Sequence, residues 1–368
     1  MSNLGTLAWL FETGGIELCR GPLFDETPPA PPPGARLRDR VEGMLLGLAI
    51  GDALGNTSEG LLPGDRRARY GEIRDYLPNR HAEGRRVGLP SDDTQLAFRT
   101  LAQLLEDGEL LPEHLAERFA AERIFGIGQA VAQFVFNVRA GQPWHRAGPH
   151  SAGNGALMRI APVLLPHLSN PSPALWADTA LAAMLTHNDS ASTAACLAFV
   201  RLLWELLGRD TRPAPEWWLA GYLESARGLE LDKPYTPRGG AQRSFFGPLW
   251  RYVEVVVPPA WAEGLDVVAA GHRWHSGAYL LETVPSVLYV LMRYGDDPEE
   301  AIVRAVNDTR DNDTIAAIVG AAVGALHGRS RLPRRWVENL LGRTAAQDDG
   351  QVFRLLDAAC ERWTTPVG

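Results

Sequence analysis

The chain has 368 residues, of which 45% are hydrophobic and 22% are charged, and its formal net charge at pH 7 is −8. This length and composition are typical of a globular protein with one large or two ordinary domains. The negative charge excludes a general nucleic-acid-binding surface, which needs clustered Lys and Arg, but it allows a pocket for one phosphorylated ligand.

Cysteine usage and hydropathy predict a cytoplasmic protein. Cys19, Cys196 and Cys360 are too few and too widely spaced for a disulfide framework or a CxxC metal site. The start "MSNLGTLAWLFETGG" has no basic segment followed by an apolar core, so no signal peptide is predicted. The apolar run "IAAIVGAAVGAL" is too short to cross a hydrocarbon layer of about 30 Å at about 1.5 Å per residue. We therefore expect no membrane association.

Residues 1–37 differ in composition from the rest and are predicted to form an N-terminal extension. Strand-like apolar residues surround the turn signal Gly14-Gly15, and "ETPPAPPPGA" forms a stiff proline-rich connector. Two interpretations stay open. The segment is either a tail packed on the domain or an arm that the connector holds away from the body to reach a partner.

Residues 38–368 are predicted to form one domain that is almost wholly helical. Apolar residues recur at helical spacing, and the segment after residue 333 predicts one or two closing helices. "YVEVVV", at 252–257 before Pro258-Pro259, is the best candidate for a strand. Glycines recur every fourth residue in 43–55 and in 320–328, which predicts two central, closely packed helices, because one face of each helix then carries no side chain.

Two acidic pairs stand at predicted helix starts. "SDDT" contains Ser91, Asp92 and Asp93, and "NDTRDNDT" contains Asp311, Asp313 and Thr314. A single carboxylate is enough to cap a helix, whereas crowded carboxylates repel one another. If the fold brings the pairs together, cations are needed, and these oxygen ligands suit Mg²⁺, Mn²⁺ or Ca²⁺ rather than Zn²⁺. An EF-hand is excluded, because Ile315 stands at position five and the sixth-position glycine is missing.

Three further segments carry polar residues of ambiguous role. "GDALGNTSE" ends in Glu59, which together with Asp52 could equally be a solvated or capping acid. "SAGNG", with Ser151, Gly153, Asn154 and Gly155, precedes a helical run and could expose N–H groups to phosphate. In "THNDS", His187 would by default be a structural histidine.

Together these stretches resemble the ADP-ribosylglycohydrolase family between about residues 40 and 330. The resemblance rests on five segments in the family's order, "GMLLGLAIGDALGNTSE", "SDDT", "GNGALMRIAPV", "THND" and "DNDTIAAIVGAAVGA", with a looser sixth match in "SGAYLLETVPSVLYVL".

The resemblance implies a compact, orthogonal all-α domain that removes ADP-ribose from protein side chains, with arginine as the expected linkage. It implies two Mg²⁺ ions, or Mn²⁺, held by Ser91, Asp92, Asp93, Asp311, Asp313 and Thr314. Glu59, Asp92 and Asp311 are the implied catalytic residues. The implied ligand contacts come from Ser151, Gly153, Asn154, Gly155, His187 and Tyr279.

The chain also departs from the family pattern. Thr309-Arg310 replaces the usual Gly-Gly, Ala278 replaces a glycine, and Ser91 replaces a threonine whose hydroxyl it retains. Asp308 lies outside the matching motif and is interpreted as a helix-end residue.

Two other functions remain open from the sequence. One is an immunity protein whose residues 1–37 block an ADP-ribosyltransferase toxin, alone or in addition to hydrolysis. The other is an inactive relative that only binds ADP-ribose, which the retained acids disfavour.

Overall fold

The computed structural model describes residues 1–32, 34–346 and 350–365 and is all-α, as predicted. Within these residues, extended backbone pairs only in isolated β-bridges. The α-helices are α1 (Asn3–Thr13), α2 (Ala35–Gly55), α3 (Pro63–Tyr70), α4 (Asp92–Asp107), α5 (Pro112–Ala121), α6 (Gln129–Arg139), α7 (Trp144–Ala147), α8 (Ala174–Met184), α9 (Ser190–Gly208), α10 (Pro215–Ala226), α11 (Leu249–Ala262), α12 (Val267–Trp274), α13 (Leu280–Tyr294), α14 (Pro298–Asp308), α15 (Asn312–His327), α16 (Arg334–Asn339) and α17 (Gln351–Trp363). Short 3₁₀ turns are η1 (Pro22–Asp25), η2 (Asn56–Ser58), η3 (Arg80–Ala82), η4 (Leu157–Arg159), η5 (Ala161–His167) and η6 (Arg329–Arg331).

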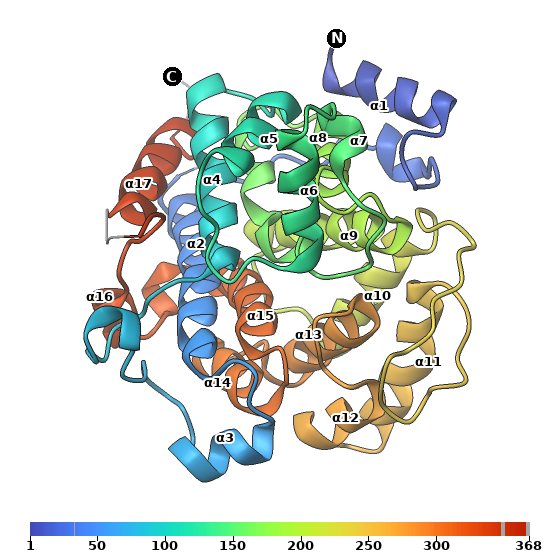
Figure 1. Cartoon of the computed structure of the whole chain (residues 1–368). Coiled ribbons are helices and arrows are strands. Elements are labelled where there is room, and N and C mark those ends of the chain that lie inside the picture. Colours follow the sequence, from blue (N-terminus) through green and yellow to red (C-terminus); the bar gives the residue numbers. More distant parts are fainter. Residues whose placement is uncertain (33, 347–349, 366–368) are drawn as a thin grey trace.

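The two glycine-striped helices, α2 and α15, lie side by side at the centre of the molecule (Figure 1). Their backbones touch along the stripe. A Cβ built on Gly47 would lie 2.1 Å from the carbonyl oxygen of Gly320, and one on Gly43 would lie 2.5 Å from that of Gly324. The prediction of two central, closely packed helices is confirmed. The lost helix propensity of the glycines is offset by this contact.

Helix α9 packs against α8, α10 and α15 and is the one described helix long and apolar enough to cross a membrane. Of its most apolar window, 83% is buried inside the protein. Apolar side chains such as Leu197 and Leu203 have no exposed surface. This is the pattern of a core helix that is covered on all sides.

The strand predicted at residues 252–257 is wrong. The segment lies inside α11, which continues through both Pro258 and Pro259. Buried residues recur at helical spacing, with Tyr252, Val253, Val256 and Val257 facing the core. Glu230 stabilises the helix start, because its carboxylate accepts the N–H groups of Leu249 and Trp250 at 2.7 and 2.8 Å. The β-branched valines misled the prediction because tertiary packing outweighs their strand preference.

The N-terminal extension packs on the domain instead of reaching away from it. Its buried apolar side chains include Leu7, Leu10, Ile16, Leu18, Leu23 and Phe24. The connector is fastened as well, since the indoles of Trp176 and Trp204 each donate to a carbonyl oxygen, of Glu26 and Pro29 respectively, at 2.8 Å. The geometry favours the packed tail over the arm held away from the body.

Substituting Gly47 by alanine should destabilise the protein by an amount at the upper end of roughly 1–3 kcal/mol, because the added methyl group would meet the Gly320 backbone. The matched control is Gly64→Ala in the exposed helix α3, where a Cβ meets no atom within 4 Å. Urea unfolding of both variants measures the difference. Equal stability of the two would contradict the close packing of α2 and α15.

Candidate functional site

The start of α4 is organised by Asp52, a fully buried carboxylate near the end of α2. It accepts the backbone N–H groups of Ser91 and Thr94 at 2.8 and 3.1 Å, and both their hydroxyls at 2.6 Å. Asn56 donates a further hydrogen bond at 3.0 Å. Asp52 therefore caps a neighbouring helix and fixes the position from which Asp92 and Asp93 project.

The start of α15 lies directly against the end of α2. A Cβ on Gly55 would stand 2.4 Å from the Cα of Asp313. The side-chain amide of Asn312 donates to the Gly55 carbonyl and to the Ser58 hydroxyl, both at 3.0 Å. The Thr314 N–H donates to Asp313 at 2.9 Å. These contacts place the second acidic pair beside the turn that carries Glu59.

The structure brings the two acidic pairs together, and their carboxylates act on one another. Burial raises the pKa of Asp92 to about 8, and the charge of Asp52 adds to this shift. Burial raises the pKa of Asp311 to about 6, although the bond from Asn154 opposes this rise. Burial also raises the pKa values of Asp93 and Asp313 well above the usual range, with further contributions from the neighbouring carboxylates.

Glu59 stands at the rim of this cluster, where its side chain reaches solvent. The surrounding protein raises its pKa by desolvation, and the Asp52 charge contributes a smaller part. A carboxylate whose pKa is shifted toward neutrality and that remains accessible is suited to proton transfer.

The donor set fits a hard cation. Asp93 is 1% exposed, and its buried Oδ1 has no hydrogen-bond partner among the described residues. The hydroxyls of Ser91 and Thr314 add neutral oxygens beside the carboxylates. Within the described part of the chain, no three His, Cys, Asp or Glu side chains already form a compact ligand cage. The oxygen donors of these residues therefore have the chemistry that a hard cation prefers.

The loop 151–155 is joined to the acidic cluster through Asn154. The Asn154 side-chain amide donates to Asp311 at 2.6 Å and to the Thr283 hydroxyl at 3.0 Å. Its backbone N–H donates to the Ala278 carbonyl at 3.1 Å. The segment that the sequence associated with a phosphorylated ligand thus lies beside the second acidic pair.

His187 and Tyr279 border the same loop. Tyr279 pairs with Gly153 in a β-bridge, and the guanidinium of Arg238 lies over its ring, 4.3 Å from the centroid. A Cβ on Gly155 would stand 2.9 Å from Cε1 of His187. Ser151 accepts the Gly153 N–H at 3.3 Å. All six predicted ligand contacts therefore lie around one loop.

The sequence left the role of one buried acid of this region open and missed another. The capping role considered for Asp52 is confirmed, although nothing local shows that its partner Ser91 lies 39 residues further along the chain. Glu282 is 3% exposed, its Oε1 has no hydrogen-bond partner among the described residues, and burial raises its pKa to about 7. The sequence did offer one signal for Glu282, since a single acidic residue within the apolar run of α13 is expected to be buried.

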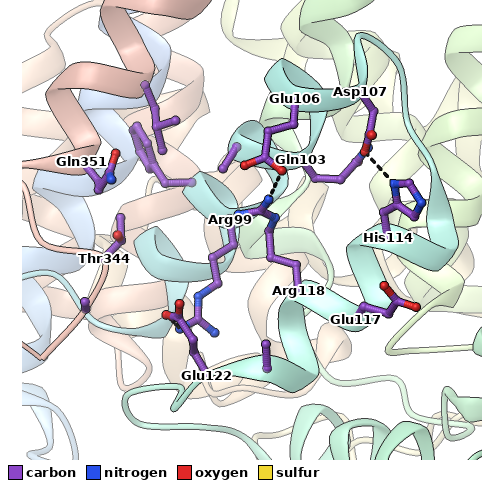
Figure 2. A pocket seen from close by; sticks show the side chains of 15 residues that line it. Arg99, Gln103, Glu106, Asp107, His114, Glu117, Arg118, Glu122, Thr344 and Gln351 are labelled. Carbon is purple, nitrogen blue, oxygen red and sulfur yellow. Dashed lines mark hydrogen bonds and ion pairs between the residues drawn. The ribbon is translucent and has the colours of Figure 1, made fainter.

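A groove of about 610 Å³ lies away from this cluster, between α4, α5 and the segment that leads into α17 (Figure 2). Three of the four acids that line it are paired with a basic side chain. Arg118 bonds Glu106, His114 lies 3.0 Å from Asp107, and Arg99 lies 3.0 Å from Glu122. None of the predicted site residues lines this groove, so we place the candidate site at the acidic cluster and not in the groove.

Comparison with known proteins identifies the family to which the chain is similar. A family model described as ADP-ribosylglycohydrolase matches residues 33–365. An ADP-ribosyl-[dinitrogen reductase] glycohydrolase of Rhodospirillum rubrum is 27% identical over 89% of this chain and 98% of the relative. An ADP-ribosylarginine hydrolase, Tri1, of Pseudomonas putida is 28% identical over 82% of this chain and 74% of the relative. A solved structure titled "ADP-ribosylglycohydrolase-related protein complex" is 28% identical, with a TM-score of 0.67 over 90% of this chain and 99% of that chain.

Replacing Asp52 by asparagine should lower the free energy of unfolding by on the order of 3 kcal/mol, because an NH₂ group would then face buried donors. Asp65→Asn, at an exposed position in α3, is the control and should change stability little. Urea denaturation of both variants provides the measurement. A loss below about 1 kcal/mol for Asp52→Asn would show that the capping network is not a main support of α4.

Proposed function

The chain belongs to the ADP-ribosylglycohydrolase family and is a hydrolase of that family, and from this premise we propose that it releases ADP-ribose from modified protein side chains at the acidic cluster. The observation that carries the proposal is the 2.6 Å bond from Asn154 to Asp311, which joins the loop 151–155 to the acidic cluster at the start of α15.

We propose that Ser91, Asp92 and Asp93 on one side, and Asp311, Asp313 and Thr314 on the other, hold two Mg²⁺ ions, or Mn²⁺. When bound, such ions would offset the repulsion between the carboxylates, orient the hydroxyls of the ribose and polarise a water molecule. The unpartnered Oδ1 of Asp93 and the raised pKa values of the cluster support this assignment.

The chain's own residues would then position and cleave the substrate. Backbone N–H groups of the loop 151–155 other than those of Gly153 and Asn154, which already donate within the protein, can hold the diphosphate without Lys or Arg. This is consistent with the acidic composition. Cleavage at C1″ of the ribose builds oxocarbenium-like charge, which nearby carboxylates stabilise. Glu59 would accept the proton of the attacking water, and its raised pKa brings it closer to the pH at which a general base is most effective.

Arginine is the linkage that we propose. A relative named ADP-ribosylarginine hydrolase supports this choice. Serine-linked and nucleic-acid-linked ADP-ribose remain the competing substrates. A cytoplasmic location and the absence of membrane and nucleic-acid partners stay predictions from the composition.

A second function, occlusion of an ADP-ribosyltransferase toxin by residues 1–37, would need an accessible surface on this segment. Leu4 and Trp9 on α1 are 44% and 38% exposed and could contact a partner. The other apolar side chains of the extension are largely used in packing on the domain. A blocking role would therefore rest on one face of α1, and hydrolysis is the function that the geometry supports better.

Release of ADP-ribose from arginine-, serine- and nucleic-acid-linked substrates, each with and without a chelator, tests the proposal. We expect Mg²⁺-dependent release from arginine. Glu59→Gln should lower kcat by about 10²–10⁴-fold while leaving the affinity for ADP-ribose unchanged, because it removes only the proton acceptor.

Glu117→Gln, at an exposed position lining the separate groove, is the matched control and should retain full activity. Asp92→Ala and Asp311→Ala should abolish release. Retention of release by both aspartate variants would overturn the placement of the site.

Metal binding should also appear as a pH-dependent gain in stability. The folded protein keeps protons on Asp311 and Asp92 up to about pH 6 and about pH 8, whereas the unfolded chain releases them near pH 4. Without cations, stability should therefore fall as the pH rises through this window. Added Mg²⁺ should raise the Tm more at pH 8 than at pH 5.5.

Thermal unfolding with Mg²⁺ or with a chelator measures this difference. Asp311→Asn should reduce the Mg²⁺ effect, and Asp65→Asn should preserve it. An equal Mg²⁺ effect at both pH values would argue against ions held by these carboxylates.

A further inference from the structure

A chain of hydrogen bonds behind the loop 151–155 joins three buried residues. Arg159, in η4, has no exposed surface, and its Nη2 donates to the Ala182 carbonyl at 2.9 Å and to the Thr186 hydroxyl at 2.7 Å. The Thr186 hydroxyl lies 2.9 Å from Nδ1 of His187. Thr186 is fully buried and His187 is 2% exposed. Either the Thr186 hydroxyl or a protonated Nδ1 of His187 could donate in this contact. The other hydrogen bond of Thr186 decides which of the two is the donor.

Which group donates in each of these hydrogen bonds follows from the donors and acceptors that the three side chains carry. A guanidinium can only donate, so the Thr186 oxygen accepts from Arg159 and keeps one O–H to give away. Among the residues that the structure describes, the only acceptor within reach of that O–H is Nδ1 of His187. If Nδ1 carried the proton instead, the Thr186 O–H would be a buried donor without a partner, which costs about 1–3 kcal/mol. Nδ1 is therefore the acceptor, and the ring proton resides on Nε2.

The protonated nitrogen faces the loop that borders the acidic cluster. A Cβ on Gly155 would stand 3.2 Å from Nε2, and one on Gly153 would stand 3.5 Å from it. Nε2 has no hydrogen-bond partner among the described residues. It is not completely enclosed by protein atoms, so a ligand atom can approach it. It is therefore a donor that remains available beside the loop.

We propose that Arg159 and Thr186 are positioning residues that hold His187 as the neutral Nε2–H tautomer, so that it donates one hydrogen bond to an oxygen of the bound ligand. The tautomer follows from this chain's own contacts. The identity of the ligand as ADP-ribose rests on the proposed function. His187 is in this view a fixed donor and takes no part in proton transfer.

The charge of the neighbourhood agrees with this assignment. Burial lowers the pKa of His187 to about 3, and the positive charge of Arg159 adds to the effect. Burial also lowers the pKa of Arg159 to about 10, which leaves the guanidinium charged at neutral pH. The Phe119 ring, with its centroid 4.9 Å from the Arg159 guanidinium, stabilises this buried charge. A charged arginine and an uncharged histidine can therefore coexist behind the loop.

The test is a long-range ¹H–¹⁵N correlation spectrum of the full chain with ¹⁵N-labelled histidine, in which His187→Gln identifies the signals of residue 187. We expect a protonated Nε2 and an unprotonated Nδ1 in the wild type. Thr186→Ser keeps the hydroxyl and should preserve this pattern. Thr186→Val has nearly the same shape but lacks the hydroxyl, and it should release the tautomer to a mixture or to Nδ1–H.

Calorimetric titration with ADP-ribose supplies the second readout. Thr186→Val should weaken binding by about ten-fold, the value of one hydrogen bond, whereas Thr186→Ser should stay within about two-fold of the wild type. The spectrum of the wild type alone decides the tautomer, so a poorly folded Thr186→Val variant does not remove the test.

Each contrary result points to a different error. An Nδ1–H signal in the wild type would overturn the proposal. A tautomer that changes in Thr186→Val without loss of affinity would overturn the donor role of His187. Failure of the wild type to bind ADP-ribose would count against the proposed function and the ligand contact together, while the spectrum would still decide the positioning by Thr186.

Discussion

The close approach of α2 and α15 is the constraint on which the rest of the structure depends. At Gly47 and Gly320 each backbone occupies the space in which a side chain of the other helix would stand. Because the helices touch along their whole stripe, the end of α2 meets the start of α15, where Gly55 contacts Asp313. The contact brings the turn that carries Glu59 to the second acidic pair. The glycines thus have no chemical role, yet they determine the distance between groups that do.

A cluster assembled in this way concentrates negative charge, and the fold has to tolerate it without a cation during folding. Hydrogen bonds from neighbouring polar groups offset part of the cost of burying these carboxylates. The Asp52 carboxylate accepts hydrogen bonds from four donors of Ser91 and Thr94 at the start of α4, and Asp311 accepts one from Asn154. Asp93 has no such compensation at Oδ1. The uneven distribution of hydrogen bonds separates carboxylates that organise the backbone from carboxylates that remain open to an ion, a division that residue type alone does not reveal.

The helical class, the glycine contact and the two acidic pairs were predictable because each depends on residues that are only a few positions apart in the sequence. Periodicity over several turns identifies a helix, and a carboxylate pair beside a hydroxyl at a helix start identifies a candidate ligand set. The helix that Asp52 caps was not predictable, since the donors of Ser91 and Thr94 belong to α4 and not to the helix that carries Asp52. The helical state of residues 252–257 was missed because valine-rich segments satisfy both periods over so short a window, and the cap from Glu230 is a tertiary contact. Whether residues 1–37 pack or project likewise depends on the surface they meet, which no pattern within them describes.

The departure Thr309-Arg310 from the family's Gly-Gly can be understood from the same region. Neither residue has a positive φ, so the backbone here does not require glycine. The unusual conformation is found opposite, at Ser276, whose φ is +46° and whose carbonyl accepts the N–H groups of both Arg310 and Asp311 at 3.1 Å. A left-handed non-glycine residue of this kind costs about 1–3 kcal/mol, and here it holds the backbone of Asp311 in place. Arg310 has no ion pair among the described residues. Burial lowers the pKa of His275, and the charge of Arg310 adds to this shift. Burial raises the pKa of Glu282, and the charge of Arg310 opposes this rise. The backbone that leads to Asp311 therefore has no need of glycine at these two positions, and the charge of Arg310 acts on His275 and Glu282.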